Sequence, residues 1–88
     1  MPYVYLLRCA DGSLYAGVAK DLAKRLVQHQ EGRASRYTRG RLPVDLVWSC
    51  EVDSWGAALR EEMRIKALSR ERKEALIRPH GTTRPPEL

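Results

Sequence analysis

Side chains suited to proton transfer, charge neutralisation or metal binding are spread along the chain at Tyr5, Tyr15, Arg25, His29 and Glu62. Arg25 and His29 are one helical turn apart, so on a helix they share a strip of surface and can act together. Glu62 and Lys66 have the same spacing and fall inside the apolar arc of their expected helix. A carboxylate fixed beside apolar surface is what a hard divalent cation requires. The alternative interpretation is a Glu-to-Lys ion pair at the edge of the buried face.

Whether the two tyrosines meet depends on the register of a β-hairpin. Residues 3–9 and 13–18 are rich in aromatic and β-branched residues and flank an Asp-Gly pair, which predicts two antiparallel strands. A two-residue loop would place Tyr5 and Tyr15 on opposite faces, whereas a three-residue loop with a left-handed Gly12 pairs Tyr5 with Gly17. We expect the longer loop, because it makes one face nearly all apolar and builds the core there. The other face then presents both phenols beside Gly17, with room for a group to approach.

The middle of the chain predicts a helix, a loop and a third strand. A helix is expected over residues 22–31 behind an aspartate cap, with an apolar arc made of Leu22, Ala23, Leu26 and Val27. Residues 32–41 lack an apolar period and predict a loop. Residues 44–50 alternate and are rich in β-formers, so they predict a strand that joins the hairpin's sheet.

Two helices are expected in the last third, over residues 55–68 and 70–77, each preceded by a serine that can cap it. The apolar arc of the first of them comprises Trp55, Ala58, Leu59, Met63 and Ile65. Pro79 and Gly81 are expected to end regular structure. The sequence therefore predicts a single domain over residues 1–80 and a flexible tail over residues 81–88.

Composition points to a polyanionic partner. The 88 residues carry a net charge of +5 and have a pI near 9.6, which makes nucleic acid the first candidate and an inert basic surface the alternative. The predicted loop holds four arginines around Tyr37 and no acid: Arg33, Arg36, Arg39 and Arg41. These side chains suit phosphates and a stacked base, which gives affinity without sequence specificity; a solvated loop is the alternative.

Other classes of protein are disfavoured. The longest uncharged apolar run, residues 3–7, is far shorter than the roughly 20 residues of a membrane helix. The start of the chain lacks the pattern of a secretory signal, so a cytoplasmic location is expected. Cys9 and Cys50 are too few for a disulfide scaffold or a four-cysteine zinc site, and reduced core thiols are expected.

Several short motifs occur in an order that is similar to the GIY-YIG nuclease domain, above all to its small stand-alone members. They are Tyr3-Val4-Tyr5, Tyr15-Ala16-Gly17, Lys20-Asp21-Leu22-Ala23-Lys24-Arg25-Leu26, Tyr37-Thr38-Arg39-Gly40 and Ala58-Leu59-x-x-Glu62-x-x-Ile65-Lys66. The resemblance implies an α/β fold in which a three-stranded antiparallel sheet is flanked by helices, in the order hairpin, helix, strand and two helices. Val18 departs from the family, because excision-repair members carry a lysine there, and the chain has no asparagine to match a late one.

The same resemblance implies site residues. Tyr5 and Tyr15 match the motif tyrosines, Arg25 matches the helix arginine, and His29 matches a histidine one turn later. Glu62 matches the acidic ligand of a single divalent metal, Mg²⁺ or Mn²⁺. Phosphodiester cleavage would then use Arg25 on the phosphate and a tyrosine to orient or deprotonate water, with His29 relaying the proton.

The function expected from this resemblance is a divalent-metal-dependent DNA endonuclease that serves repair or recombination, with DNA favoured over RNA. No separate DNA-binding domain is evident, so structure-selective or nonspecific cutting is expected. The expected nucleic-acid-binding residues are Lys20, Lys24, Arg33, Arg36, Tyr37, Arg39 and Arg41. The alternatives are a non-catalytic nucleic-acid-binding module with the same fold and a protein-interaction domain.

Overall fold

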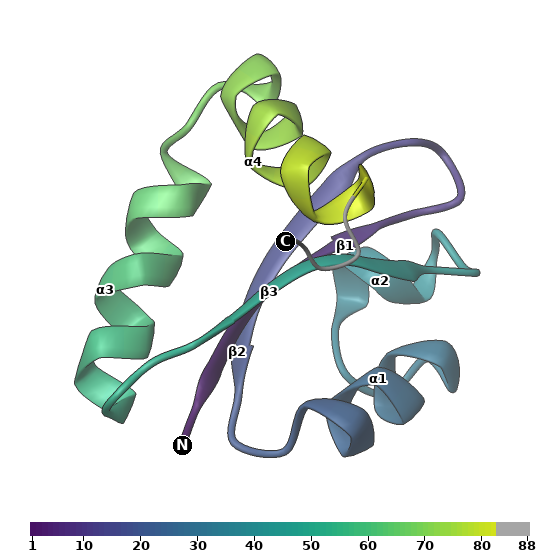
Figure 1. The fold of residues 1–88 in the computed structure, drawn as a ribbon. Coiled ribbons are helices and arrows are strands. Elements are labelled where there is room, and N and C mark those ends of the chain that lie inside the picture. Colours follow the sequence, from purple (N-terminus) through teal and green to yellow (C-terminus); the bar gives the residue numbers. More distant parts are fainter. Residues whose placement is uncertain (83–88) are drawn as a thin grey trace.

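The computed structural model describes residues 1–82 (Figure 1). Three strands, β1 (Tyr3–Arg8), β2 (Leu14–Ala19) and β3 (Asp45–Glu51), form an antiparallel sheet in the order β2-β1-β3. Four helices complete the fold: α1 (Leu22–Gln30), α2 (Arg36–Arg39), α3 (Trp55–Lys66) and α4 (Arg70–Thr82). The predicted α/β fold with a helix-flanked, three-stranded antiparallel sheet is confirmed.

The hairpin has the register predicted from the three-residue loop. The backbone N–H of Cys9 donates to the carbonyl of Ser13 over 2.9 Å, and Gly12 adopts a positive φ of 87°. Tyr5 therefore lies opposite Gly17. This register places Tyr5 and Tyr15 on the same face of the sheet.

The prediction of open space beside Gly17 is wrong. A methyl group on Gly17 would lie 2.5 Å from the hydroxyl oxygen of Tyr5 and 2.6 Å from its Cζ atom. The Tyr5 ring itself fills the space above the glycine, and only 1% of Tyr5 is exposed. Gly17 therefore makes room for the buried phenol ring of Tyr5, and the space beside it is not open to a ligand.

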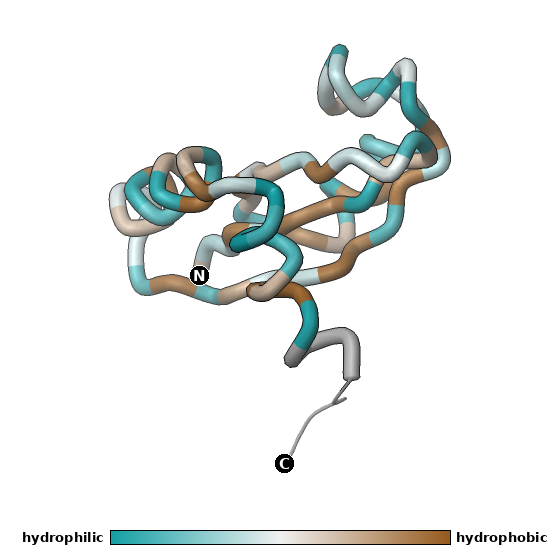
Figure 2. Tube along the Cα trace, turned by 90° about the horizontal axis from the view of Figure 1, so that it is seen from above, coloured by the Kyte–Doolittle hydropathy of each residue, from teal (hydrophilic) through white to brown (hydrophobic). Residues whose placement is uncertain are grey.

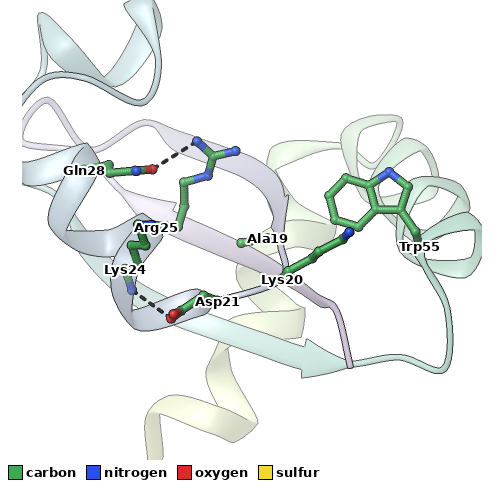
Figure 3. A pocket seen from close by; sticks show the side chains of 7 residues that line it. All are labelled: Ala19, Lys20, Asp21, Lys24, Arg25, Gln28 and Trp55. Atoms are coloured by element: carbon green, nitrogen blue, oxygen red, sulfur yellow. Dashed lines mark hydrogen bonds between the residues drawn. The ribbon is translucent and has the colours of Figure 1, made fainter.

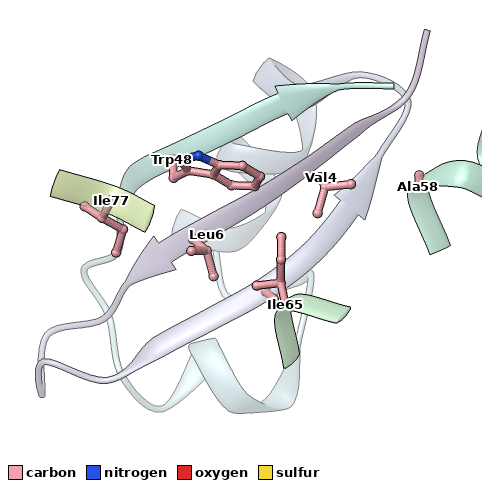
Figure 4. Close-up of a cluster of buried hydrophobic side chains, with 7 residues drawn as sticks. Val4, Leu6, Trp48, Ala58, Ile65 and Ile77 are labelled. Carbon is pink, nitrogen blue, oxygen red and sulfur yellow. The ribbon is translucent and has the colours of Figure 1, made fainter. Parts of the chain in front are cut away.

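Both faces of the sheet are packed, although the sequence predicted a core on one face. One buried cluster lies between the sheet and the two C-terminal helices and comprises Val4, Leu6, Ala16, Trp48, Ala58, Ile65 and Ile77 (Figure 4). The other lies on the tyrosine face, beneath α1, and comprises Tyr5, Leu7, Cys9, Ala19 and Val44. We call them the aliphatic face and the tyrosine face. Figure 2 shows the hydrophobic residues gathered along the strands between more hydrophilic helices.

The buried side of α1 differs from the predicted apolar arc. Ala23 and Val27 are exposed, whereas Leu22 and Leu26 pack against the tyrosine face and His29 is the buried residue of the helix. The helix lies with this side toward the sheet because His29 finds hydrogen-bond partners there. The spacing of apolar residues alone could not reveal that a histidine is the centre of the contact.

The predicted arc of α3 is also wrong in part. Ala58 and Ile65 are fully buried, but Leu59 is 40% exposed and Met63 is 71% exposed. Because α3 packs against β1 and β2 through one narrow strip, residues one position away from that strip face outward. Glu62 lies at the edge of the strip and is half-buried.

Two further segments differ from expectation. The predicted basic loop contains the short helix α2, whose N-terminus is capped by Ser35. Helix α4 continues past Pro79 and Gly81 to Thr82, so the predicted end at those residues is wrong. Pro79 removes one helical hydrogen bond, to the carbonyl of Ala75, an exposed residue. The remainder of the predicted tail, residues 83–88, lies outside the described residues.

Three further features of residues 1–82 concern membrane spans, thiols and an ion pair. No helix in this range has both the length and the apolar character needed to cross a membrane. Cys9 is buried and Cys50 is half-buried, and both are free thiols. Arg8 on β1 forms a two-pronged ion pair with Glu74 on α4, at 2.7 and 2.9 Å, which holds that helix to the sheet.

Candidate active site

A chain of buried hydrogen bonds forms the centre of the tyrosine face. The Nε2 atom of His29 lies 2.8 Å from the hydroxyl of Tyr5, and its Nδ1 atom lies 2.9 Å from the hydroxyl of Thr38. The Thr38 hydroxyl donates to the carbonyl of Ser35 over 3.4 Å. A carbonyl can only accept, so Thr38 accepts from Nδ1–H and the neutral Nε2 accepts the proton of Tyr5.

Burial and nearby charges set the protonation of this chain. Burial raises the pKa of Tyr5 above its usual range, Tyr15 and Glu62 raise it further, and the Arg25 guanidinium opposes them. Burial, followed by the charge of Arg25, lowers the pKa of His29. At neutral pH Tyr5 therefore keeps its proton and His29 is uncharged, as the hydrogen bonds require. Arg25, Glu62 and Tyr15 all lie close enough to influence Tyr5.

An aromatic column leads from His29 to the surface. The ring of Tyr15 meets His29 edge to face with centroids 5.4 Å apart, and it stacks on Tyr37 at 5.8 Å. The Arg41 guanidinium lies 3.9 Å from the centroid of Tyr37. Tyr15 is half-buried and Tyr37 is exposed, so Tyr15 connects the buried chain with solvent.

Glu62 fits a metal ion as a single protein ligand. Its side chain is 17% exposed, and one carboxylate oxygen pairs at 3.3 Å with Lys66, which is 55% exposed. Because Lys66 is exposed, its side chain can move away from Glu62, and the Glu62 carboxylate is then only partly hydrated. Among the described residues no three His, Cys, Asp or Glu side chains form a metal-binding cluster. Mg²⁺ is suited to such a setting, because it keeps several waters and is held by one or two carboxylates and substrate phosphates.

A hollow of about 300 Å³ opens between α1 and the start of α3 (Figure 3). It is lined by Ala19, Lys20, Asp21, Lys24, Arg25, Gln28 and Trp55. Arg25 is the one residue of the five predicted catalytic positions that lines it. The Arg25 guanidinium makes a long hydrogen bond of 3.4 Å to Gln28, which leaves most of its N–H groups available. The structure thus gathers Tyr5, Tyr15 and His29 at the buried chain and Arg25 at the adjoining hollow.

The predicted nucleic-acid-binding residues fall into two groups. Lys20 and Lys24 are exposed beside the hollow. In the region of α2, Arg33 pairs with Glu31 and Arg41 pairs with Asp11. The segment itself holds no acid, but acids from flanking segments neutralise two of its four arginines. Within the described part of the chain, the remaining two, Arg36 and Arg39, are exposed and form no ion pair.

Sequence reasoning missed two residues of this region. Thr38 is fully buried and fixes His29, but no periodicity connects them because a turn separates their helices. Trp55 was assigned to the apolar arc of α3, yet it is 40% exposed and lines the hollow. Its position at the first residue of a capped helix was the available signal, because such residues seldom lie deep in a core.

Comparison with known families decides the identity of this domain. The family model of the GIY-YIG catalytic domain matches residues 1–75. The chain belongs to the GIY-YIG family. This confirms the resemblance that the motifs indicated, and a GIY-YIG domain implies nuclease-type activity on a nucleic-acid substrate.

UPF0213 proteins are among the relatives of this chain. A UPF0213 protein of Vibrio cholerae is 51% identical over 76 residues, which cover 85% of this chain and 75% of the relative. A UPF0213 protein of Staphylococcus saprophyticus is 45% identical over 75 residues, covering 85% and 92% of the two chains. The solution NMR structure of a UPF0213 protein from Bacillus halodurans is 42% identical, with a TM-score of 0.60 over 93% of this chain and 88% of that one.

Proposed function

We propose that this GIY-YIG protein is a divalent-metal-dependent endonuclease that cleaves phosphodiester bonds in DNA, with structure-selective or nonspecific cutting and a role in repair or recombination. The buried Thr38–His29–Tyr5 chain supports this proposal best. Its phenol is hydrogen-bonded to a neutral imidazole, and the charges of Arg25 and Glu62 both act on the pKa of that phenol. Burying polar groups is costly unless each is hydrogen-bonded, which favours a functional reason for this chain over packing alone.

Arg25 and Glu62 are proposed to act on the scissile phosphate. Arg25 presents a permanent charge with forked donors, and its single long hydrogen bond leaves it free to bind phosphate. Glu62 would hold Mg²⁺ or Mn²⁺, and the metal would supply positive charge to the phosphate and to the departing oxygen.

The two tyrosines are proposed to have different roles. Tyr15 reaches solvent and can therefore contact and orient the attacking water. Tyr5 is sealed and hydrogen-bonded to His29, whereas Tyr15 meets His29 only through its ring. Both ring nitrogens of His29 are bound to buried hydroxyls, those of Tyr5 and Thr38, and Tyr5 keeps its proton at neutral pH. The ring of His29, held by Tyr5 and Thr38, meets the ring of Tyr15 edge to face. We therefore propose that Tyr5 and His29 position Tyr15 for its contact with water.

Backbone contacts are proposed to supply affinity for DNA. Lys20 and Lys24 border the hollow, and the exposed Arg36 and Arg39 add positive charge within α2, the helix that carries Tyr37. Such contacts neutralise phosphate charges, and salt weakens them. They give affinity that does not depend on the base sequence.

Nicking of supercoiled plasmid tests the proposal. With Mg²⁺ or Mn²⁺ the wild type should nick, and Arg25→Ala and Glu62→Ala should each lower the rate by about 100-fold or more while the circular dichroism spectrum is kept. Glu61→Ala is the matched control, because Glu61 neighbours Glu62 but pairs outward with Arg64. Labelled flaps, junctions, duplexes and RNA would then define the substrate. Absence of wild-type nicking with every metal, alongside salt-sensitive DNA binding, would instead favour a non-catalytic binding module.

A further inference from the structure

Trp55 is an exposed aromatic residue placed among cations. It begins α3, is 40% exposed and forms one wall of the 300 Å³ hollow. The Nζ atom of Lys20 lies 5.7 Å from the centroid of its ring. Figure 3 shows the indole across the hollow from the α1 side chains Lys24 and Arg25, with Ala19 between them as a small floor residue.

The size and chemistry of the hollow define what can enter. A volume of about 300 Å³ is at the lower end for small-ligand sites, which suits one nucleotide and not a base pair. Its walls offer an aromatic face on one side and ammonium and guanidinium groups on the other. A base stacks favourably on an indole, and phosphate groups bind to lysine and arginine.

We propose that this hollow is a binding site for one unpaired nucleotide, whose base stacks on Trp55 while its phosphate is held by Lys24 and Arg25. The proposal rests on the proposed nuclease function and adds a substrate class to it. Bases in a continuous duplex are stacked on each other and cannot reach an indole. The site therefore favours DNA with single-stranded character next to the bond that is cut.

The rest of α3 argues against a protein partner as the main ligand of Trp55. Leu59 and Met63 continue an exposed apolar strip along the helix, but neither of them lines the 300 Å³ hollow. Trp55 alone among the three faces a concave surface with three cations, Lys20, Lys24 and Arg25. Cations beside an aromatic face match a nucleotide better than an apolar peptide.

Fluorescence and affinity measurements without divalent metal test this site in the absence of cleavage. Trp48 is buried and Trp55 is exposed, so stacking of a base should quench mainly Trp55. Single-stranded DNA should quench the wild type, whereas an abasic oligonucleotide of equal length should not. Trp55→Phe should remove the quenching but largely keep the affinity, since a phenyl ring also stacks.

Affinity separates stacking from general electrostatic attraction. Trp55→Ala should weaken binding of the single strand about 5- to 150-fold and leave duplex binding unchanged. Leu59→Ala is the matched control, because it has the same 40% exposure one turn further along α3 and lies outside the hollow. Equal effects of the two variants, or equal quenching by duplex and single strand, would overturn the nucleotide site.

Plasmid nicking in parallel separates the two proposals. Normal nicking by a wild type that shows no preference for unpaired bases would remove the nucleotide site and leave the nuclease function standing. Absence of both nicking and nucleic-acid binding would remove both. Capture of a protein through the Trp55, Leu59 and Met63 strip, with no effect of Trp55→Ala on DNA, would show that the strip serves a protein partner instead.

Discussion

The two faces of one small sheet are built on different principles. The buried cluster of the aliphatic face is made of aliphatic residues such as Val4, Leu6 and Ile65, together with the indole of Trp48. The tyrosine face buries Tyr5, His29 and Thr38 and must satisfy their polar atoms with one another. Apolar contacts are non-directional, whereas buried hydrogen bonds fix orientation. The aliphatic face therefore stabilises the fold, and the tyrosine face holds side chains at defined angles.

Ile65→Ala should have the largest effect on stability. Ile65 is fully buried between α3 and the sheet, and its truncation should lower the free energy of unfolding by about 2 to 5 kcal/mol. Urea unfolding measures this loss. Nicking per folded molecule should be unchanged under conditions where the variant remains folded. A large loss of nicking from fully folded Ile65→Ala would show that the two faces are not independent.

Gly17→Ala should damage both stability and the site. The added methyl would meet the buried Tyr5 ring at 2.5 to 2.6 Å, and a sealed ring has little room to move. Overpacking of this kind costs about 1 to 3 kcal/mol, and displacement of Tyr5 should also reduce nicking. Gly40→Ala is the control, because a methyl there meets no atom within 4 Å and φ is −85°. If Gly17→Ala is as stable and active as Gly40→Ala, the absence of a side chain at Gly17 is not needed to accommodate the Tyr5 ring.

Local signals predicted most of the fold. Caps at Asp21 and Ser54, the Gly12 turn and the alternation of the strands depend on residues close in sequence, and the structure has these features where they were expected. The exposed sides of α1 and α3 were mispredicted because Val27 and Met63 are apolar but face outward. Which apolar residues become buried depends on how each helix lies on the sheet, and that is a tertiary property.

The site could be predicted as a set of residues but not as a geometry. The hairpin register predicted that Tyr5 and Tyr15 lie on one face of the sheet, and helical spacing predicted that Arg25 and His29 lie on one strip of α1. Nothing local showed that Tyr5 is sealed, that Tyr15 is the phenol in contact with solvent, or that Thr38 holds the imidazole. These facts arise where α2 and α1 close over the sheet, between segments far apart in sequence.

Thr38→Val should cost about 1 kcal/mol, less than the two substitutions above, but should alter the site specifically. Without the hydroxyl, the Nδ1–H of His29 loses its acceptor. The ring can then shift its proton to Nε2, which reverses the hydrogen bond with Tyr5. Imidazole ¹⁵N chemical shifts would report this change of tautomer, and the pH profile of nicking should change with it.

Thr38→Ser is the matched variant for that experiment. It keeps the hydroxyl and should restore the wild-type tautomer and most of the activity, although it loses a buried methyl group. If Thr38→Val keeps the wild-type tautomer and pH profile, Thr38 contributes packing alone.

The smallest expected effect is a gradual loss of stability at mildly acidic pH. The pKa of His29 is lowered in the folded protein, so below the ordinary histidine value near 6.5 the unfolded chain binds more protons than the folded one. The contribution of His29 is therefore complete above about pH 6.5 and declines as the pH falls through its folded pKa. An imidazolium could no longer accept from Tyr5, and it would also face Arg25. Urea unfolding between pH 7.5 and 5.5 measures this decline while most carboxylates stay ionised. The slope should disappear in His29→Gln, and an equal slope in that variant would assign the pH dependence to groups outside the tyrosine face.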